Sequence, residues 1–132
     1  MKPPCEIVSR YVLPTVRALV AERLLDKSGL TQMDAALKVG LTQSAMSRYL
    51  ASERGRRIKM APHVRNLVNS MAEGISKNKL SHEEILERMC HICITLRKSG
   101  GLCEFHRRIV PSLSKTCEIC SRTFDREFAS QT

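Results

Sequence analysis

The sequence predicts an all-α fold, a small helical bundle followed by a short cysteine-rich C-terminal appendage. Aromatic residues make up only 4% of the 132 residues and tryptophan is absent. β-Sandwiches and barrels usually contain more aromatic and β-branched residues than this. The abundant Leu, Ala, Met, Arg, Lys and Glu favour helices, and apolar residues recur at helical spacing. The length suits one small domain, or one small domain with an appendage.

Prolines mark the beginning of the chain. Pro3 and Pro4 predict an extended N-terminal arm. Pro14 predicts the first turn of a helix, because its missing N–H group would have no partner there. We expect this helix to end near Gly29. Its apolar stripe consists of Val16, Leu19, Val20 and Leu24.

Cap residues divide the next segment into two short helices. Thr31 predicts the N-cap of the first, with Asp34 three residues later in a position typical of a capping box. Gly40 ends this helix. Thr42 or its neighbour predicts the cap of the following helix, which we expect to run to about Leu50.

The second half of the chain is predicted to begin after a polar linker. A basic loop at residues 52–59 precedes a fourth helix, which Pro62 opens. The polar stretch 74–79 then favours a boundary between a first domain, residues 1–75, and a C-terminal segment, residues 81–132. That segment starts with a fifth helix, for which Ser81 to Glu84 form a capping box.

Residues 30–50 have the pattern of a helix–turn–helix. Ala36 is small where two helices would cross closely, and Gly40 lies where a tight turn requires a left-handed backbone. The side chains predicted to pack the two helices together are Ala35, Val39, Leu41, Met46 and Tyr49 or Leu50. The exposed face of the second helix would carry polar side chains able to contact bases or phosphates, namely Thr42, Gln43, Ser44, Ser47 and Arg48.

These residues resemble the helix–turn–helix of Cro/cI-type (XRE-like) repressors. The likeness is carried by Gln32, the Ala36/Gly40 pair, the Gln43-Ser44 start of the second helix and the basic stretch 53–57. It covers roughly residues 12–73. With its cysteine-rich tail, the whole chain resembles a group of archaeal predicted regulators of this class.

The resemblance implies a recognition helix in the major groove of double-stranded DNA, bound by a homodimer on a two-fold site. Gln43 would pair with adenine, and Arg48 with guanine or phosphate. Gln32 would brace Gln43 or contact the DNA backbone. The full set of implied DNA-binding residues is Gln32, Thr42, Gln43, Ser44, Ser47, Arg48, Arg54, Arg56 and Arg57.

The distribution of charge agrees with a polyanionic partner. The formal net charge is +9, and residues 30–60 hold six Lys or Arg side chains against two acidic ones. A basic excess centred on the predicted DNA-recognition segment favours nucleic acid as the partner. Charge alone, however, is equally consistent with a solubilising surface.

The C-terminal half contains a second constellation, of possible metal ligands. Cys90-x-x-Cys93 and Cys117-x-x-Cys120 are two pairs with the spacing of tetrahedral thiolate sites. Cys103 is a further candidate and His106 a weaker one. The sixth cysteine, Cys5, is isolated in sequence and is expected to be inert.

Several arrangements of these ligands are open. The two pairs could hold zinc; Cys90, Cys93, Cys103 and His106 could hold zinc and leave Cys117 and Cys120 as a redox pair; or four of the five thiols could hold an iron–sulfur cluster. Redox thiols without metal, or simple apolar packing of the cysteines, are the remaining interpretations.

The sequence therefore predicts a cytoplasmic DNA-binding transcriptional regulator, metal- or redox-responsive through its C-terminal cysteines. The alternative is a nucleic-acid-binding adaptor with a purely structural zinc site.

No membrane span is expected, because no apolar stretch is long enough. We do not expect an enzyme: no Ser-His-Asp set, phosphate-binding glycine loop or paired catalytic carboxylates are found. A thiol-redox enzyme is disfavoured because a strand–helix–strand context is missing.

Overall fold

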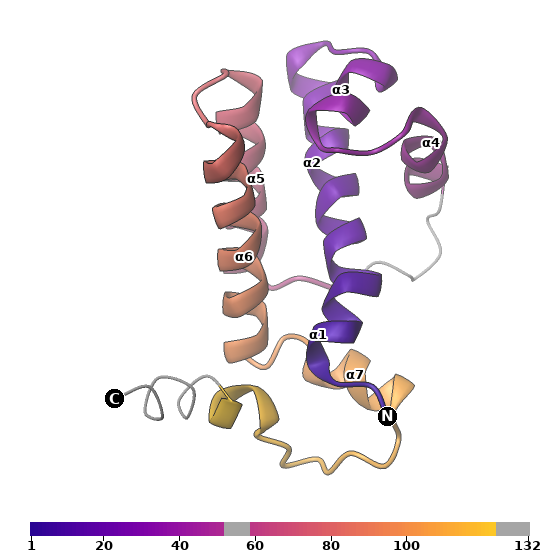
Figure 1. Ribbon diagram of the computed structural model, residues 1–132, viewed down its shortest axis with the longest axis vertical. Helices are drawn as coiled ribbons and strands as arrows, with labels where there is room; N and C mark the ends of the chain where they lie inside the picture. Colours follow the sequence, from indigo (N-terminus) through magenta and orange to yellow (C-terminus); the bar gives the residue numbers. More distant parts are fainter. Residues whose placement is uncertain (52–58, 124–132) are drawn as a thin grey trace.

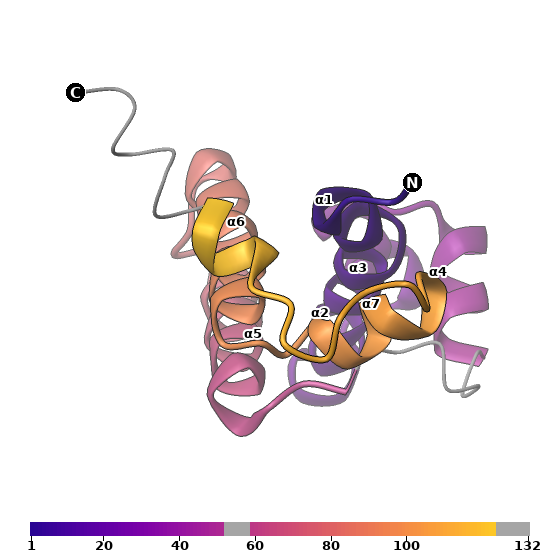
Figure 2. The ribbon, with the colours of Figure 1, turned by 90° about the horizontal axis from the view of Figure 1, so that it is seen from below.

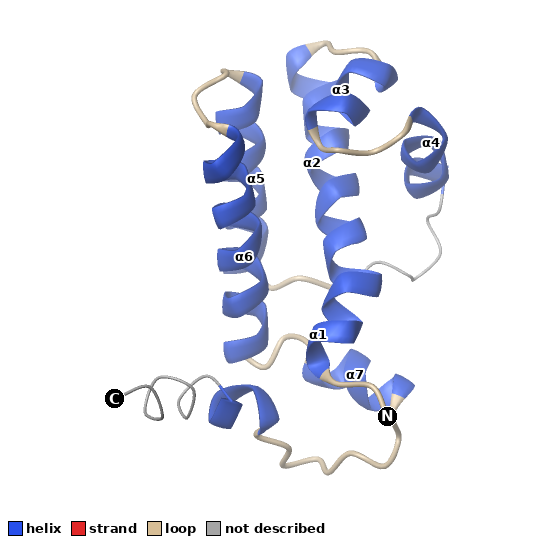
Figure 3. Cartoon of the chain, viewed as in Figure 1, coloured by secondary structure: helices blue, strands red, loops and turns tan. Residues whose placement is uncertain are grey.

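The computed structural model describes residues 1–51 and 59–123, and every regular element in these ranges is helical. Seven α-helices and one π-helical turn lie between residues 4 and 109, residues 119–123 are also helical, and no strand occurs in the described part of the chain (Figure 3). The all-α prediction is confirmed.

The chain begins with one uninterrupted helical segment. It consists of α1 (Pro4–Ile7), a π-helical turn (Val8–Val12) and α2 (Leu13–Ser28), with right-handed helical dihedrals at both junctions. The predicted extended arm is therefore wrong from Pro4 onward. The wide π turn precedes Pro14, whose ring lacks an N–H and would clash with the carbonyl four residues back in a regular α-helix. The segment ends at Gly29, in the left-handed conformation (φ 64°).

The two short helices are α3 (Gln32–Lys38) and α4 (Gln43–Ala51). The Thr31 side chain accepts a hydrogen bond from the Asp34 N–H (3.2 Å), and the Thr42 side chain accepts one from the Ala45 N–H (3.1 Å). Gly40, between the helices, has φ 72°. The predicted caps and the left-handed turn residue are all confirmed, because these signals act within a few residues of the backbone they control.

Three long helices run side by side and form the body of the molecule (Figure 1). α5 (Pro62–Ser76) packs on α2, and α6 (His82–Lys98) packs on both α5 and α2. The short α7 (Cys103–Ile109) lies across the end of the bundle near the N-terminus (Figures 1 and 2).

Two contacts tie α7 to the N-terminal segment. The rings of Tyr11 and Phe105 meet edge to face with centroids 5.0 Å apart. The Nε2 atom of His106 lies 2.7 Å from the backbone carbonyl oxygen of Lys2. Since a carbonyl oxygen only accepts hydrogen bonds, Nε2 carries a proton and donates the hydrogen bond.

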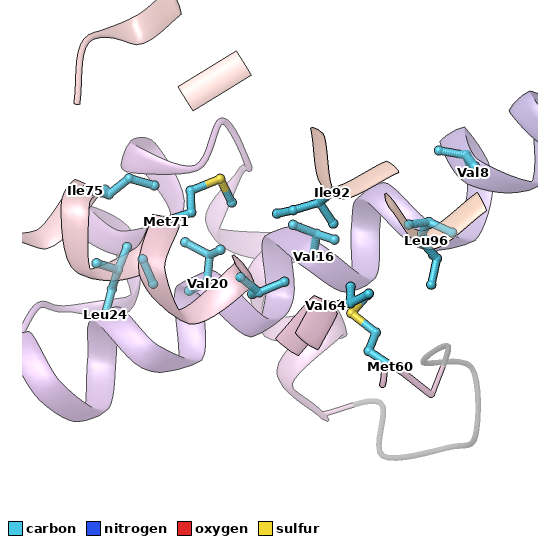
Figure 4. Packing of buried hydrophobic residues seen from close by; sticks show 14 of the residues in the cluster. Val8, Val16, Val20, Leu24, Met60, Val64, Met71, Ile75, Ile92 and Leu96 are labelled. Carbon is cyan, nitrogen blue, oxygen red and sulfur yellow. The ribbon is translucent and has the colours of Figure 1, made fainter. Parts of the chain in front are cut away.

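A single hydrophobic core joins the two predicted domains. Val16 and Leu24 of α2, Val64 of α5, and Ile92 and Leu96 of α6 are all nearly or completely buried and belong to one cluster (Figure 4). Within their described parts, the ranges 1–75 and 81–132 therefore contribute side chains to the same core.

The predicted linker at residues 74–79 is a helix end and a tight turn. Gly74 lies inside α5, and its carbonyl accepts a hydrogen bond from the Lys79 N–H (2.9 Å). A Cβ atom at Gly74 would come within 2.8 Å of the Leu80 side chain, so the glycine allows this close approach. The capping box of Ser81 and Glu84 then starts α6 as predicted, with both reciprocal hydrogen bonds present.

The shared core generates a test. Leu96 of α6 is completely buried, so Leu96→Ala should lower the free energy of unfolding by about 2–5 kcal/mol. We expect thermal unfolding of the wild type to be one cooperative transition that this substitution shifts as a whole. Leu37→Ala is the matched control, because Leu37 of α3 is 71% exposed. Two separate transitions, of which only one responds to Leu96→Ala, would show that α6 belongs to an independent unit.

Candidate nucleic-acid interface and cysteine cluster

The pair α3–α4 is fixed to the bundle by buried apolar side chains. Ala35 and Ala36 of α3 and Met46 of α4 are at most 1% exposed and belong to the main core. The Leu41 N–H donates to the Ala36 carbonyl (2.9 Å) and closes the turn between the helices. α4 consequently lies beside α2, on the side opposite α5 and α6 (Figures 1 and 2).

The outer surface of α4 is polar. Buried Met46 fixes which side of the helix faces the core, and the residues predicted to contact DNA lie away from it. Five of the predicted DNA-binding side chains are exposed: Thr42, Gln43, Ser44, Ser47 and Arg48. The structure thus presents these groups together on one short, well-anchored helix and its cap.

Gln32 and Ser47 connect the two helices of this surface. The Ser47 hydroxyl donates to the Gln32 side-chain oxygen at 3.0 Å. Gln32 therefore braces Ser47 in this structure, and its predicted contacts with Gln43 or the DNA backbone stay predictions. A second polar contact, from Lys38 Nζ to Asn78 Oδ1 (3.1 Å), joins the end of α3 to the turn before α6. The predicted phosphate contacts Arg54, Arg56 and Arg57 lie outside the described residues.

The cysteines gather at the other end of the bundle. Cys90 and Cys93 are on α6, Cys103 begins α7, and Cys117 and Cys120 follow in the last described stretch. A cavity of about 90 Å³ at this end has Cys103, His106, Cys117 and Cys120 among its lining residues.

Burial and the neighbouring thiols raise the pKa of two of these cysteines, Cys93 and Cys103. Burial raises the pKa of Cys93; Arg97 opposes the shift, and Cys90, Cys120 and Cys5 add to it. Burial also raises the pKa of Cys103, with further contributions from Cys120 and Cys117 and an opposing one from Arg107. At neutral pH both groups are therefore thiols rather than thiolates.

Cys5 belongs to this neighbourhood, although the sequence suggested an isolated residue. It sits on α1, next to Pro4, which lines the same cavity. The expectation of an extended arm at Pro3 and Pro4 was wrong, because Pro4 begins α1. A proline at the first position of a helix would have placed Cys5 on the helix that reaches this end of the bundle.

The described side chains do not form an assembled metal site. In residues 1–51 and 59–123, no three His, Cys, Asp or Glu side chains are grouped so that they could hold an ion. His106 also uses its Nε2 proton on the Lys2 carbonyl. The thiols have the donor chemistry that zinc or an iron–sulfur cluster requires, but not the arrangement. Cofactor binding therefore stays a prediction.

Comparison with protein families, curated proteins and solved structures finds no match to this chain. Within the described ranges, none of the helices combines the length and apolarity needed to cross a bilayer.

Thiol reactivity tests the arrangement at the cysteine-rich end. Cys5 and Cys90 are exposed, whereas Cys120 is buried and burial raises the pKa of Cys93 and Cys103. We expect N-ethylmaleimide to modify Cys5 and Cys90 first in the native protein. Modification of Cys103 should need a higher pH than an ordinary thiol, because the thiolate is the reactive form. Peptide mass spectrometry over time, with fully unfolded protein as the control, measures each rate. Protection of Cys90 that a chelator removes would contradict this arrangement and demonstrate a bound metal.

Proposed function

We propose that the protein is a sequence-specific double-stranded-DNA-binding transcriptional regulator that uses α4 as its recognition helix. The observation that carries the proposal is the polar, exposed surface of α4, on a helix pair that the buried Ala35, Ala36 and Met46 anchor to the core. An α-helix fits the major groove of B-DNA, where base edges carry a distinct pattern of donors and acceptors.

The side chains of α4 offer different hydrogen-bonding groups to DNA. The Gln43 amide has a donor and an acceptor in the geometry that matches the N6 and N7 atoms of adenine. The Arg48 guanidinium suits guanine or a phosphate. Ser47 points its hydroxyl proton at Gln32, so it can still accept a hydrogen bond from a base donor.

The resemblance to XRE-like repressors extends the proposal to a homodimer. Two copies related by a two-fold axis would place their α4 helices in successive major grooves, about 34–36 Å apart. The basic stretch 53–57, directly after α4 in the chain, would then add phosphate contacts.

We further propose that the state of the cysteines controls how tightly the protein binds its operator. It requires that oxidation of the thiols, for example with diamide, changes affinity for the operator. It also requires that this change disappears when Cys90, Cys93, Cys117 and Cys120 are replaced by serine. Unchanged affinity after oxidation would remove the sensing role and leave the cysteines a structural one.

The alternative function is a nucleic-acid adaptor with a structural zinc. It predicts stoichiometric zinc in the purified chain, and binding to RNA that is as tight as binding to duplex DNA. Metal analysis and a competition between the two nucleic acids therefore separate it from the regulator.

Substitutions on α4 test the proposal. A binding site is first selected from random duplex DNA with the full chain. Gln43→Ala should then weaken binding to that site by about 1–3 kcal/mol and relax specificity at one base pair. Arg48→Ala should weaken binding too, and if Arg48 contacts phosphate it should reduce the salt dependence of log Kd by about 1.

The matched control is Arg65→Ala, which removes the same charge from an exposed position on α5. Fluorescence anisotropy at several salt concentrations measures all three variants. Equal losses of DNA affinity for Arg48→Ala and Arg65→Ala would show that binding depends only on overall positive charge. This result would contradict base recognition by α4.

A further inference from the structure

A second cavity lies between the long helices and the turn that precedes α4. Its volume is about 150 Å³. Val20, Met71, Ile85 and Met89 supply apolar walls from α2, α5 and α6. Figure 4 shows Met71 beside Val20. An apolar cavity of this volume accepts a ligand body of roughly the size of benzene.

The rim of this cavity has one sign of charge. Arg17 and Lys38 are the formally charged members of its lining, and none of the described lining residues is acidic. The Lys38 ammonium group is held in place by the neutral Asn78 side chain, at 3.1 Å, so this contact leaves its charge uncompensated. An apolar interior beneath cationic groups is complementary to a molecule with an apolar body and one anionic group.

We propose that this cavity binds a small apolar carboxylate. The hydrocarbon or aromatic part enters between Met71 and Met89, and the carboxylate faces Lys38 and Arg17. A ligand with several phosphates would not suit the apolar walls, since its charged groups would lose their hydration there. A neutral hydrocarbon would gain nothing from the cationic rim.

The cavity also touches the element that positions α4. Val39 and Gly40, which form the turn between α3 and α4, are lining residues. A bound ligand would therefore contact the turn and α2 together. Whether this changes DNA affinity depends on the proposed function, and it requires different ligand affinities in the two DNA-binding states. Ligand binding itself does not depend on DNA.

The methionines provide reporters for the test. Met71 and Met89 line the cavity, whereas Met46 and Met60 lie in other parts of the core. In the 132-residue chain carrying ¹³C-methyl methionine and no DNA, phenylacetate should shift the Met71 and Met89 methyl resonances in a saturable manner. The Met46 and Met60 resonances should stay in place and show that the fold is intact.

Charge variants and a neutral probe complete the design. Lys38→Gln and Arg17→Gln should each weaken phenylacetate binding by about 5- to 10-fold, the effect expected for losing one charge-assisted contact. Lys79→Gln is the matched control, because Lys79 is an exposed lysine of the nearby turn that does not line the cavity. Phenylacetamide, which has the same shape without the charge, should bind more weakly than phenylacetate to the wild type.

Three results would overturn the proposal. The first is no saturable shift at millimolar phenylacetate, and the second is equal affinity for phenylacetate and phenylacetamide. The third is a shift of Met71 and Met89 that follows protein concentration instead of ligand. Leu86 at the cavity is 53% exposed, so that last result would identify the face as a contact between two copies of the chain. If phenylacetate binds as expected but the chain does not bind DNA, the site stands and the regulatory proposal fails.

Discussion

The structure is organised around α2, whose apolar residues are buried by helices on two sides. Val12, Val16, Val20 and Leu24 are each at most 1% exposed and lie along the whole first helical segment. α5 and α6 cover this segment on one side, and α3 and α4 pack against it on the other (Figure 1). Because each partner buries apolar surface on the same helix, the helices form one cooperative core.

This central helix separates two functional regions. The α3–α4 pair lies toward one end of α2, and α7 with the cysteine-rich stretch lies at the other end (Figure 1). Any influence of the cysteines on α4 would therefore have to pass through α2 and its packing partners. The carboxylate cavity is closer to α4, because it includes the turn at Val39 and Gly40. The geometry thus favours a ligand at the cavity over a change at the cysteines as a direct route to α4.

Local signals in the sequence predicted the correct local structure. Thr31, Thr42 and the Ser81–Glu84 capping box begin helices as expected, and Gly40 adopts its left-handed turn. The features that failed depend on tertiary contacts. Residues 74–79 have the composition of a linker, but Ile92 and Leu96 bring α6 back onto α2 and turn this stretch into a tight connection. The position of Cys5 could not be read from spacing, since it depends on how the first helix meets α7. Of the candidate site, residue type and periodicity predicted the exposed face of α4, whereas the Gln32–Ser47 contact depends on how α3 packs against α4.

Methylation interference on a DNA site selected by the full chain shows directly which groove α4 contacts. Methylation of guanine N7 places a methyl group in the major groove, whereas methylation of adenine N3 places one in the minor groove. We expect N7 methylation to block binding at two clusters about one helical turn apart, and N3 methylation within those clusters to have little effect. Failure to select any duplex site, or interference confined to adenine N3, would contradict α4 as a major-groove recognition helix.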